Sequence, residues 1–244
     1  MRGAADGTLE TELEIAGRAV PVTVRPHARA MRISLRLARQ RHAVKVTVPD
    51  GVPLKKGLDF ARSRADWIGK HLAARPAPRP FVHGARIPLR GADHMIFHVP
   101  GRRGVVWAEG EGAAARICVA GAKEHLPRRL TDWLKEQARR DLQRACSRYS
   151  TLMEVSYRRL SVRDQKSRWG SCSSGRNLSF SWRLIFAPPH VLDYLAAHEA
   201  AHLAHMNHSP AFWRLVRAHC PHVDEAEAWL KQHGAGLYLW GAEG

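Results

Sequence analysis

Apolar and polar residues alternate along much of the first half of the chain. Between residues 11 and 50 the alternation is clearest at 32–37 and 44–48, which predicts two half-buried strands with arginines on their solvent face. We expect Gly17 and the segment 39–42 to form turns. Beyond them an apolar stripe with helical spacing predicts a helix over 58–72, and the proline-rich run 75–80 is expected to follow it as a stiff spacer.

Glycines then separate four short apolar runs, at 86–89, 95–99, 105–107 and 117–119, which we expect to be strands. Helical spacing takes over at about residue 122. It predicts a long amphipathic helix over 123–148 and helices from Pro188 onward, with two further strands at 159–163 and 177–184. The predicted fold class is therefore α+β. An antiparallel β-rich N-terminal domain (1–121) precedes a helix-rich domain with a small sheet (122–244).

The composition is that of a globular protein, because 45% of the 244 residues are hydrophobic. The four cysteines are far apart and form no CxxC pair, which favours reduced thiols in a cytoplasmic protein. The N-terminal segment contains acidic residues where a signal peptide would be apolar, and no run reaches the roughly 18 apolar residues that a membrane span needs. We therefore expect a cytoplasmic protein that does not contact a membrane.

Residues 188–202 carry the strongest chemical signal. Two prolines can open a helix there, because the first N–H groups of a helix have no partners within it. His198 and His202 are four residues apart, so both imidazoles leave one helix face and can share a metal ion. Glu199 can reach a water molecule on that ion without being a ligand. This is the HExxH arrangement of zinc peptidases.

A catalytic zinc site needs a third protein ligand, and two histidines are candidates. His205 lies seven residues after His198, about 10 Å along an intact helix, which is too far for metal–nitrogen bonds of about 2 Å. His208 can turn back toward the ion if the helix stops before it. Asn207 is a plausible left-handed residue at that stop, and the Ser-Pro pair at 209–210 can cap and begin a new helix. We therefore predict His208 as the third ligand and His205 as a residue outside the metal shell.

Further motifs surround these histidines. They are the run KSRWGSCS at 166–173, the run NLSFSWRL at 177–184, Tyr194, and the Asn-His-Ser and Phe-Trp sequences at 207–209 and 212–213. Together with the HExxH they resemble the YgjP-like metallopeptidase family, which is related to the SprT-like and WLM zincins. The chain departs from the family pattern at Ala200-Ala201, where a larger apolar residue is expected after the glutamate; this departure concerns packing rather than coordination.

The resemblance implies a zincin-like C-terminal domain that binds one Zn²⁺ per chain through His198, His202 and His208, with Glu199 as the catalytic general base. Three neutral imidazoles would leave a fourth position for water, and zinc would lower the pKa of that water toward about 7. Glu199 would take the water's proton during attack on a peptide carbonyl and later return it to the leaving amine. The implied substrates are peptides or unfolded protein.

The segments beside the motif allow more than one interpretation. The strand near 177–182 is expected to offer an open edge on which an extended peptide pairs. The loop 168–171 could bind a substrate carboxylate or phosphate, or it could be a tight turn in which Trp169 fills the core. Cys172 is expected to be a small buried thiol rather than a nucleophile or a ligand.

Two acidic residues are alternatives to His208, because some zincins take their third ligand from a glutamate on the next helix. These are Glu225 and Glu227. Their spacing within a predicted C-terminal helix favours the solvated face for both.

The chain has 39 Lys and Arg against 22 Asp and Glu, a net charge of +17, which predicts attraction to polyanions. The segment 25–56 alone contains nine basic residues and one acid, so a basic surface could contact nucleic acid or a nucleotide. Two alternatives to a zinc peptidase follow. One is a metal-dependent nucleotide hydrolase resembling a UTP pyrophosphatase; the other is a nucleic-acid-binding module with a structural zinc.

Overall fold

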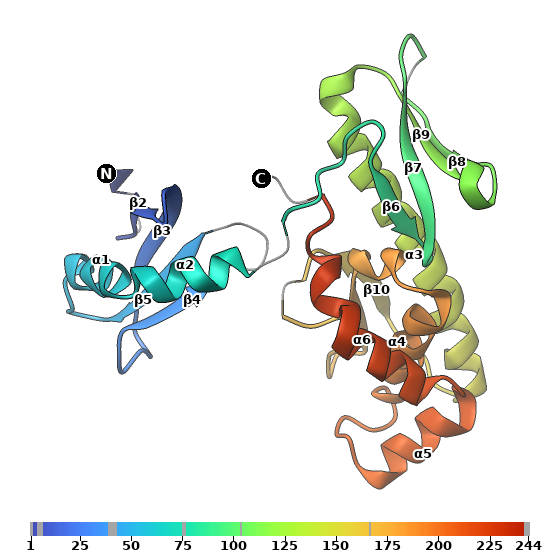
Figure 1. The fold of residues 1–244 in the computed structure, drawn as a ribbon. Helices are drawn as coiled ribbons and strands as arrows, with labels where there is room; N and C mark the ends of the chain where they lie inside the picture. Colours follow the sequence, from blue (N-terminus) through green and yellow to red (C-terminus); the bar gives the residue numbers. More distant parts are fainter. Residues whose placement is uncertain are drawn as a thin grey trace. The chain divides into compact units, whose positions relative to one another are not determined.

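The computed structural model describes residues 2–3, 7–38, 43–74, 77–102, 104–165 and 167–241. The predicted turn at 39–42 and the first two residues of the predicted spacer at 75–80 lie outside these ranges. The chain divides between Arg79 and Pro80 into two compact units (Figure 1). The domain boundary expected at 121/122 falls inside the second unit, because the strands between residues 86 and 120 share a core with the helices that follow them.

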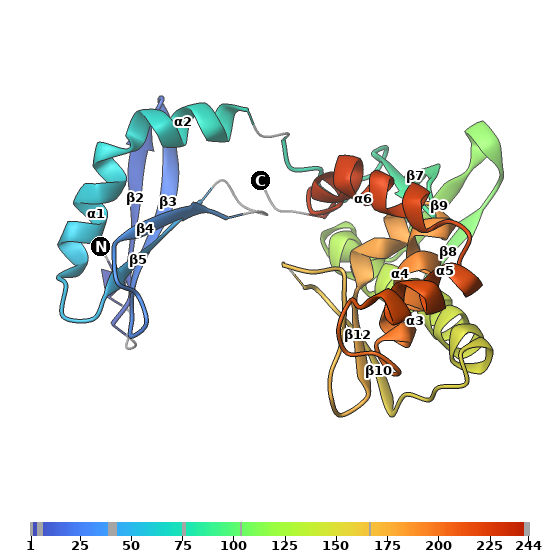
Figure 2. The same ribbon diagram turned by 90° about the horizontal axis from the view of Figure 1, so that it is seen from below.

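The first unit is a five-stranded sheet with two helices on one face (Figure 2). In sheet order the strands are β1 (Arg2–Gly3), β2 (Leu9–Ile15), β3 (Arg18–His27), β5 (Val44–Pro49) and β4 (Ser34–Leu37). The two central strands, β3 and β5, run parallel and the other neighbours run antiparallel. The α+β class is confirmed, and the sheet is mixed rather than wholly antiparallel.

The two faces of this sheet differ because side chains alternate along each strand. Every second residue over 20–24 in β3 and over 44–48 in β5 is a valine that lies in the core, at most 4% exposed, beneath the helices. The opposite face carries the predicted exposed cations together with an acidic row on β2. These residues are Arg25, Arg36, Lys45, Glu10, Glu12 and Glu14. This face is therefore mixed in charge rather than uniformly basic.

The helix predicted over 58–72 is two helices, α1 (Leu54–Ser63) and α2 (Ala65–Ala73). The break lies at Arg64, whose backbone (φ −107°, ψ 13°) leaves the helical region. The Ser63 hydroxyl donates to the Phe60 carbonyl just before it, a bond that often accompanies a bend. Each helix still buries an apolar row, with Leu58 and Ala61 in α1 and Ile68 and Leu72 in α2.

The second unit packs a four-stranded sheet against the long helix α3 (Leu126–Leu152) (Figure 1). In sheet order the strands are β6 (Arg86–Leu89), β7 (Ala92–Val99), β9 (Arg116–Ala120) and β8 (Val106–Glu109). All four predicted strands of this region are present within a few residues of their expected bounds. The predicted helix over 123–148 is also confirmed, with a short 3-10 turn at Lys123–His125 in place of its first residues.

The rest of the second unit is a three-stranded sheet and three helices. The central strand of the sheet is β12 (Asn177–Ser181), with β10 (Arg159–Arg163) parallel on one side and β11 (Gly170–Cys172) antiparallel on the other. A buried 3-10 segment, Trp182–Phe186, leads to α4 (Pro189–Ala201), α5 (Pro210–His219) and α6 (Val223–Leu237). The expectation that the strand near 177–182 has an open edge is wrong, because β12 has a partner on each side.

A buried arginine fixes the end of α6 to the 3-10 segment. Arg183 is 4% exposed, pairs with Asp164 at 2.8 Å, and donates to the carbonyls of Leu237 and Trp240 at 3.1 and 2.7 Å. Its guanidinium also lies 5.7 Å from the ring centre of Tyr238. These contacts satisfy a buried charge and hold the last turn of α6 in place.

No helix in the described part of the chain has the length and apolar character that a membrane span requires. All four cysteines are free thiols, as their spacing predicts.

We expect Gly57→Ala to destabilise the first unit by about 1–3 kcal/mol. A Cβ at Gly57 would lie 2.5 Å from Val24 Cγ1 and 2.7 Å from Val48 Cγ1, and valine side chains have little rotamer freedom to move away. Denaturant unfolding of the full chain measures the effect on the transition of the first unit. The matched control is Gly69→Ala on α2, where the new Cβ would make an ordinary 3.4 Å contact with Ile15. A loss as large for Gly69→Ala would contradict the argument.

Candidate metal centre

Helix α4 is mostly buried and carries His198 in its last turn and His202 at its C-terminal end. Pro188 caps it with an extended backbone (ψ 149°) and Pro189 begins it, as predicted. Ala200 and Ala201 are completely buried, so the small side chains at the position of the family departure pack in the core. The last residue of the helix is Ala201, and the following residue caps its C-terminus.

The helix ends earlier than the predicted stop at Asn207. After Ala201 the chain forms a tight turn, in which the N–H groups of Ala204 and His205 both donate to the Ala201 carbonyl. Asn207 does not adopt the left-handed conformation expected of it. The next helix begins as predicted, because the Ser209 hydroxyl accepts from the backbone N–H of Phe212. The segment between α4 and α5 is therefore a reversal of the chain.

This reversal brings three imidazole groups together. One nitrogen from each of His198, His202 and His208 lies within 4.8 Å of the others. Nε2 of His198 and Nε2 of His208 are 3.1 Å apart. This is the one group of three or more potential metal ligands that the described residues form. All three residues that the sequence predicted as ligands converge.

Hydrogen bonds at the far side of two rings fix which nitrogen faces the cluster. Nδ1 of His202 lies 3.0 Å from the His205 carbonyl, so this nitrogen carries the hydrogen and Nε2 is free to bind. Nδ1 of His198 lies 3.3 Å from the Tyr194 hydroxyl. Burial lowers the pKa of His198 to about 4 and also lowers that of His202, which keeps both rings neutral near pH 7. Neutral imidazoles with free lone pairs are the form that binds metals.

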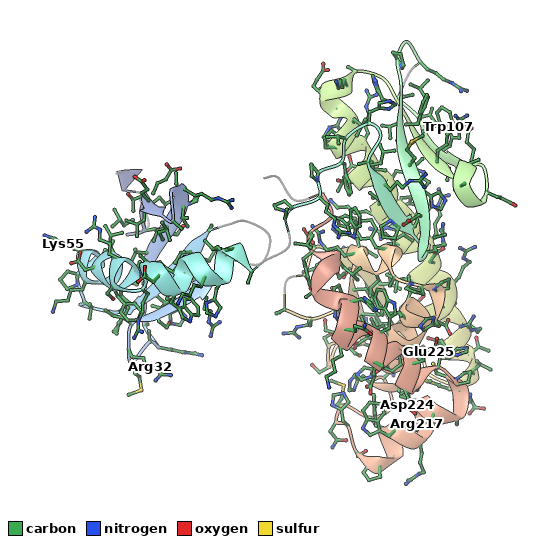
Figure 3. The ribbon with its side chains drawn as sticks, in the orientation of Figure 1. Arg32, Lys55, Trp107, Arg217, Asp224 and Glu225 are labelled. Carbon is green, nitrogen blue, oxygen red and sulfur yellow. The ribbon has the colours of Figure 1, made fainter. Side chains whose placement is uncertain are left out.

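The alternatives to His208 make other contacts. His205 supplies its backbone carbonyl to His202, and its ring is outside the cluster. Glu227 accepts a 2.7 Å hydrogen bond from Tyr194. Glu225 is 3.7 Å from His190 and is exposed on α6 (Figure 3). Neither glutamate is part of the histidine cluster.

Glu199 lies beside the cluster in a buried position, 5% exposed. Its Oε2 atom has no hydrogen-bond partner within the described residues. Burial raises the pKa of Glu199 to about 7, against the opposing effects of the Arg168 guanidinium and the backbone N–H of Cys172. A buried carboxylate with one unsatisfied oxygen is poised to accept a proton from a group that enters the site.

The strand β11 forms one wall of the site, and the sequence did not predict it. It is an edge strand whose only partner in the described sheet is β12. Its residues line an open pocket of about 330 Å³ whose other lining residues include Arg168, Glu199 and the three histidines. A backbone edge therefore lies next to the histidine cluster, where an extended chain could pair with it.

The loop before β11 was expected either to bind an anionic group or to be a tight turn with Trp169 in the core, and each interpretation fits a different residue. Trp169 stacks on Tyr238 at 5.0 Å and packs against the core, which matches the tight-turn interpretation. Arg168 is exposed and lines the pocket, where it can meet an anionic group. Cys172 is half-buried, and its burial raises the pKa of its thiol, which favours the unreactive protonated form.

The amino-acid sequence of this chain matches the model of a known protein family. The model of the family described as YgjP-like, metallopeptidase domain, matches residues 31–233. The chain belongs to the YgjP-like family. No curated protein matches it.

Two solved structures resemble part of this YgjP-like chain. They are the metallopeptidase zymogen abylysin of Pyrococcus abyssi (17% identity, 37% of this chain and 93% of that one, TM-score 0.35) and the zymogen jannalysin of Methanocaldococcus jannaschii (18% identity, 38% and 88%, TM-score 0.35).

Two features of the YgjP-like site could not be found from the spacing of the motif. Glu227 contacts Tyr194 from another helix, and the backbone of Gly170 packs directly against the Glu199 side chain. Glycine at position 170 was the available signal for the second feature, because it often marks a close approach of backbone to another group.

We expect Gly170→Ala to displace the Glu199 carboxylate. A Cβ at this position would lie 2.5 Å from Glu199 Oε1 and 2.7 Å from Cγ, so the carboxylate must move. A shift of about 1 Å can cost on the order of 100-fold in rate, and we expect a loss of peptide hydrolysis of that size. Activity assays with a crystal structure of the variant test this.

Gly175→Ala is the control for this substitution. Its Cβ would lie 3.2 Å from the end of the Asn177 side chain and at an ordinary 3.7 Å from Ser173 Oγ. Full activity in both variants, or a Glu199 carboxylate in its original place in Gly170→Ala, would show that the close approach is unimportant.

Proposed function

We propose that this YgjP-like protein is a zinc-dependent peptidase that holds one Zn²⁺ through His198, His202 and His208 and uses Glu199 as general base. The observation that carries the proposal is the convergence of three imidazoles beside a buried carboxylate with an unpartnered oxygen. Hydrolysis of peptide bonds in peptides or unfolded protein is the activity that this arrangement suits.

The donor set fits zinc. Zinc–nitrogen bonds of about 2.0–2.1 Å in tetrahedral geometry require ligand nitrogens about 3.3 Å apart. The 3.1 Å separation of the His198 and His208 nitrogens is close to this value, and all three donors lie within 4.8 Å of one another. Three histidines without a fourth protein ligand are typical of catalytic rather than structural zinc. This chemistry argues against a module in which zinc serves only the fold.

Zinc at this position would supply a Lewis acid that polarises the scissile carbonyl and makes water more acidic. The protein supplies the proton transfers. Glu199 accepts a proton from the attacking water at its unpartnered Oε2 and later donates it to the nitrogen of the leaving amine. Gly170 allows the backbone of β11 to lie directly against this carboxylate, at a place where a Cβ would displace it.

The edge strand β11 would position the substrate. An extended peptide can add to an open strand edge through main-chain hydrogen bonds, which bind without regard to side chains. β11 lies in the wall of the same pocket as the histidines, so a peptide paired there would run past them. Arg168 in the same wall would attract a carboxylate of the substrate. It would equally attract a phosphate, so nucleotides belong in the assay as competing substrates.

Glu199→Gln is expected to lower peptide hydrolysis by about 10²–10⁴-fold, because the amide cannot accept the proton. Zinc content should stay near one per chain, since Glu199 is not a ligand. Peptide or casein turnover and metal analysis of the same preparations measure both effects, with Glu225→Gln as an exposed control. Turnover of UTP in the absence of any peptide turnover would refute the peptidase proposal.

His208→Ala is expected to weaken zinc binding far more than His205→Ala. The first substitution removes a donor from the cluster, whereas the second leaves the backbone carbonyl that His205 offers to His202. Competition with a chromophoric chelator gives the two dissociation constants. The opposite order would show that the ligand assignment is wrong.

A further inference from the structure

A chain of two hydrogen bonds connects α6 to the ring of His198 on α4. The Tyr194 hydroxyl donates to Glu227 Oε1 at 2.7 Å. Because its only proton is used there, the Tyr194 oxygen acts as the acceptor toward His198 Nδ1, 3.3 Å away. The His198 hydrogen is thereby placed on Nδ1, and its Nε2 lone pair faces His208. The tautomer that can bind a metal is the one this chain of bonds selects.

The contact between Tyr194 and His198 is held by buried structure. Tyr194 and His198 are four residues apart on α4, so they share a face, and their rings meet edge to face at 5.7 Å. Tyr194 is 4% exposed and does not line the site pocket. A tyrosine phenol keeps its proton near pH 7, so the hydroxyl is available as a donor.

Helix α6 presents Glu227 from a fixed position. At its end, the buried Arg183 binds the carbonyls of Leu237 and Trp240. Near its start, Asp224 pairs with Arg217 of α5 at 2.7 Å (Figure 3). The carboxylate of Glu227 therefore reaches Tyr194 from a helix that a buried arginine holds at its C-terminal end and that an exposed ion pair joins to α5 near its start.

We propose that Tyr194 and Glu227 are positioning residues for His198: they hold its tautomer and its orientation toward the metal. The proposal rests on the function proposed above. A metal-ligating histidine commonly donates its other N–H to such a partner, and here a phenol relays the effect of a carboxylate on a different helix. Two other roles do not fit the contacts. Glu227 lies outside the ligand cluster, and the Tyr194 hydroxyl is engaged and buried away from the pocket that a substrate would enter.

Zinc affinity, measured by chelator competition without any substrate, tests the pair. Tyr194→Phe leaves the His198 N–H without its partner, and we expect zinc to bind about 10–100-fold more weakly. Glu227→Ala frees the Tyr194 proton to turn toward His198, so it should also weaken binding, and Glu227→Gln should restore part of the loss by accepting that proton again. In the Tyr194→Phe background, Glu227→Ala should have no further effect, because the chain of bonds is already interrupted.

Glu225→Gln is the matched control on the same helix, since Glu225 contacts His190 rather than Tyr194. Nitrogen-15 NMR of the metal-free protein adds a second measurement: His198 should carry its hydrogen on Nδ1 in the wild type and lose this preference in Glu227→Ala. Because Glu227 is exposed, that variant remains informative even if Tyr194→Phe unfolds. If the wild type binds zinc and every variant binds it with the same affinity, the positioning role is wrong while the proposed metal centre stands. Additive losses of affinity in the double variant would have the same meaning. A wild-type chain that binds no zinc would overturn the proposed metal centre and the positioning role with it.

Discussion

The early end of helix α4 is the constraint on which the whole site depends. If the helix continued to His208, that residue would lie about 15 Å along the axis from His198, out of reach of a shared ion. Instead the helix ends at Ala201, and the chain reverses over the next few residues. The 3.1 Å approach of the two imidazole nitrogens is a consequence of this reversal. The Ser209 cap then begins α5 immediately after His208, which limits how far that histidine can move.

Local features of the site were predictable because they lie within a short stretch of sequence. The i, i+4 spacing of His198 and His202 and the Ser-Pro start of α5 depend only on helix geometry and capping. The position of the helix end was not predictable in the same way. The contact between the His202 ring and the His205 carbonyl stabilises the turn, and it forms only once the chain has already left the helix. Backbone preference at Asn207 carries no information about such a contact.

The features that sequence patterns missed depend on tertiary contacts. Alternation predicts that a segment is a strand but not which strands it joins, so β12 was assigned an edge that belongs to β11. β11 is only three residues long, too short to show any period. The strands between residues 86 and 120 resemble those of the first unit in pattern, yet their apolar faces pack on α3, and this moves the division of the chain to Arg79 and Pro80. The contact between Tyr194 and Glu227 joins residues 33 apart, beyond any local rule.

The large positive charge of the chain is less informative about the site than a single arginine. On α3, Arg128, Arg140 and Arg144 pair with acids of the same helix. The open sheet face of the first unit carries glutamates as well as cations, so the described residues do not gather the net charge of +17 on that face. Exposed charges further apart than about 8 Å are largely screened at physiological salt. Arg168, in contrast, lies in the wall of the site, where its field lowers the pKa of Glu199 against the effect of burial. The proton affinity of the buried carboxylate is thus set by its immediate surroundings: burial favours the protonated form, and the Arg168 guanidinium and the Cys172 backbone N–H favour the charged form.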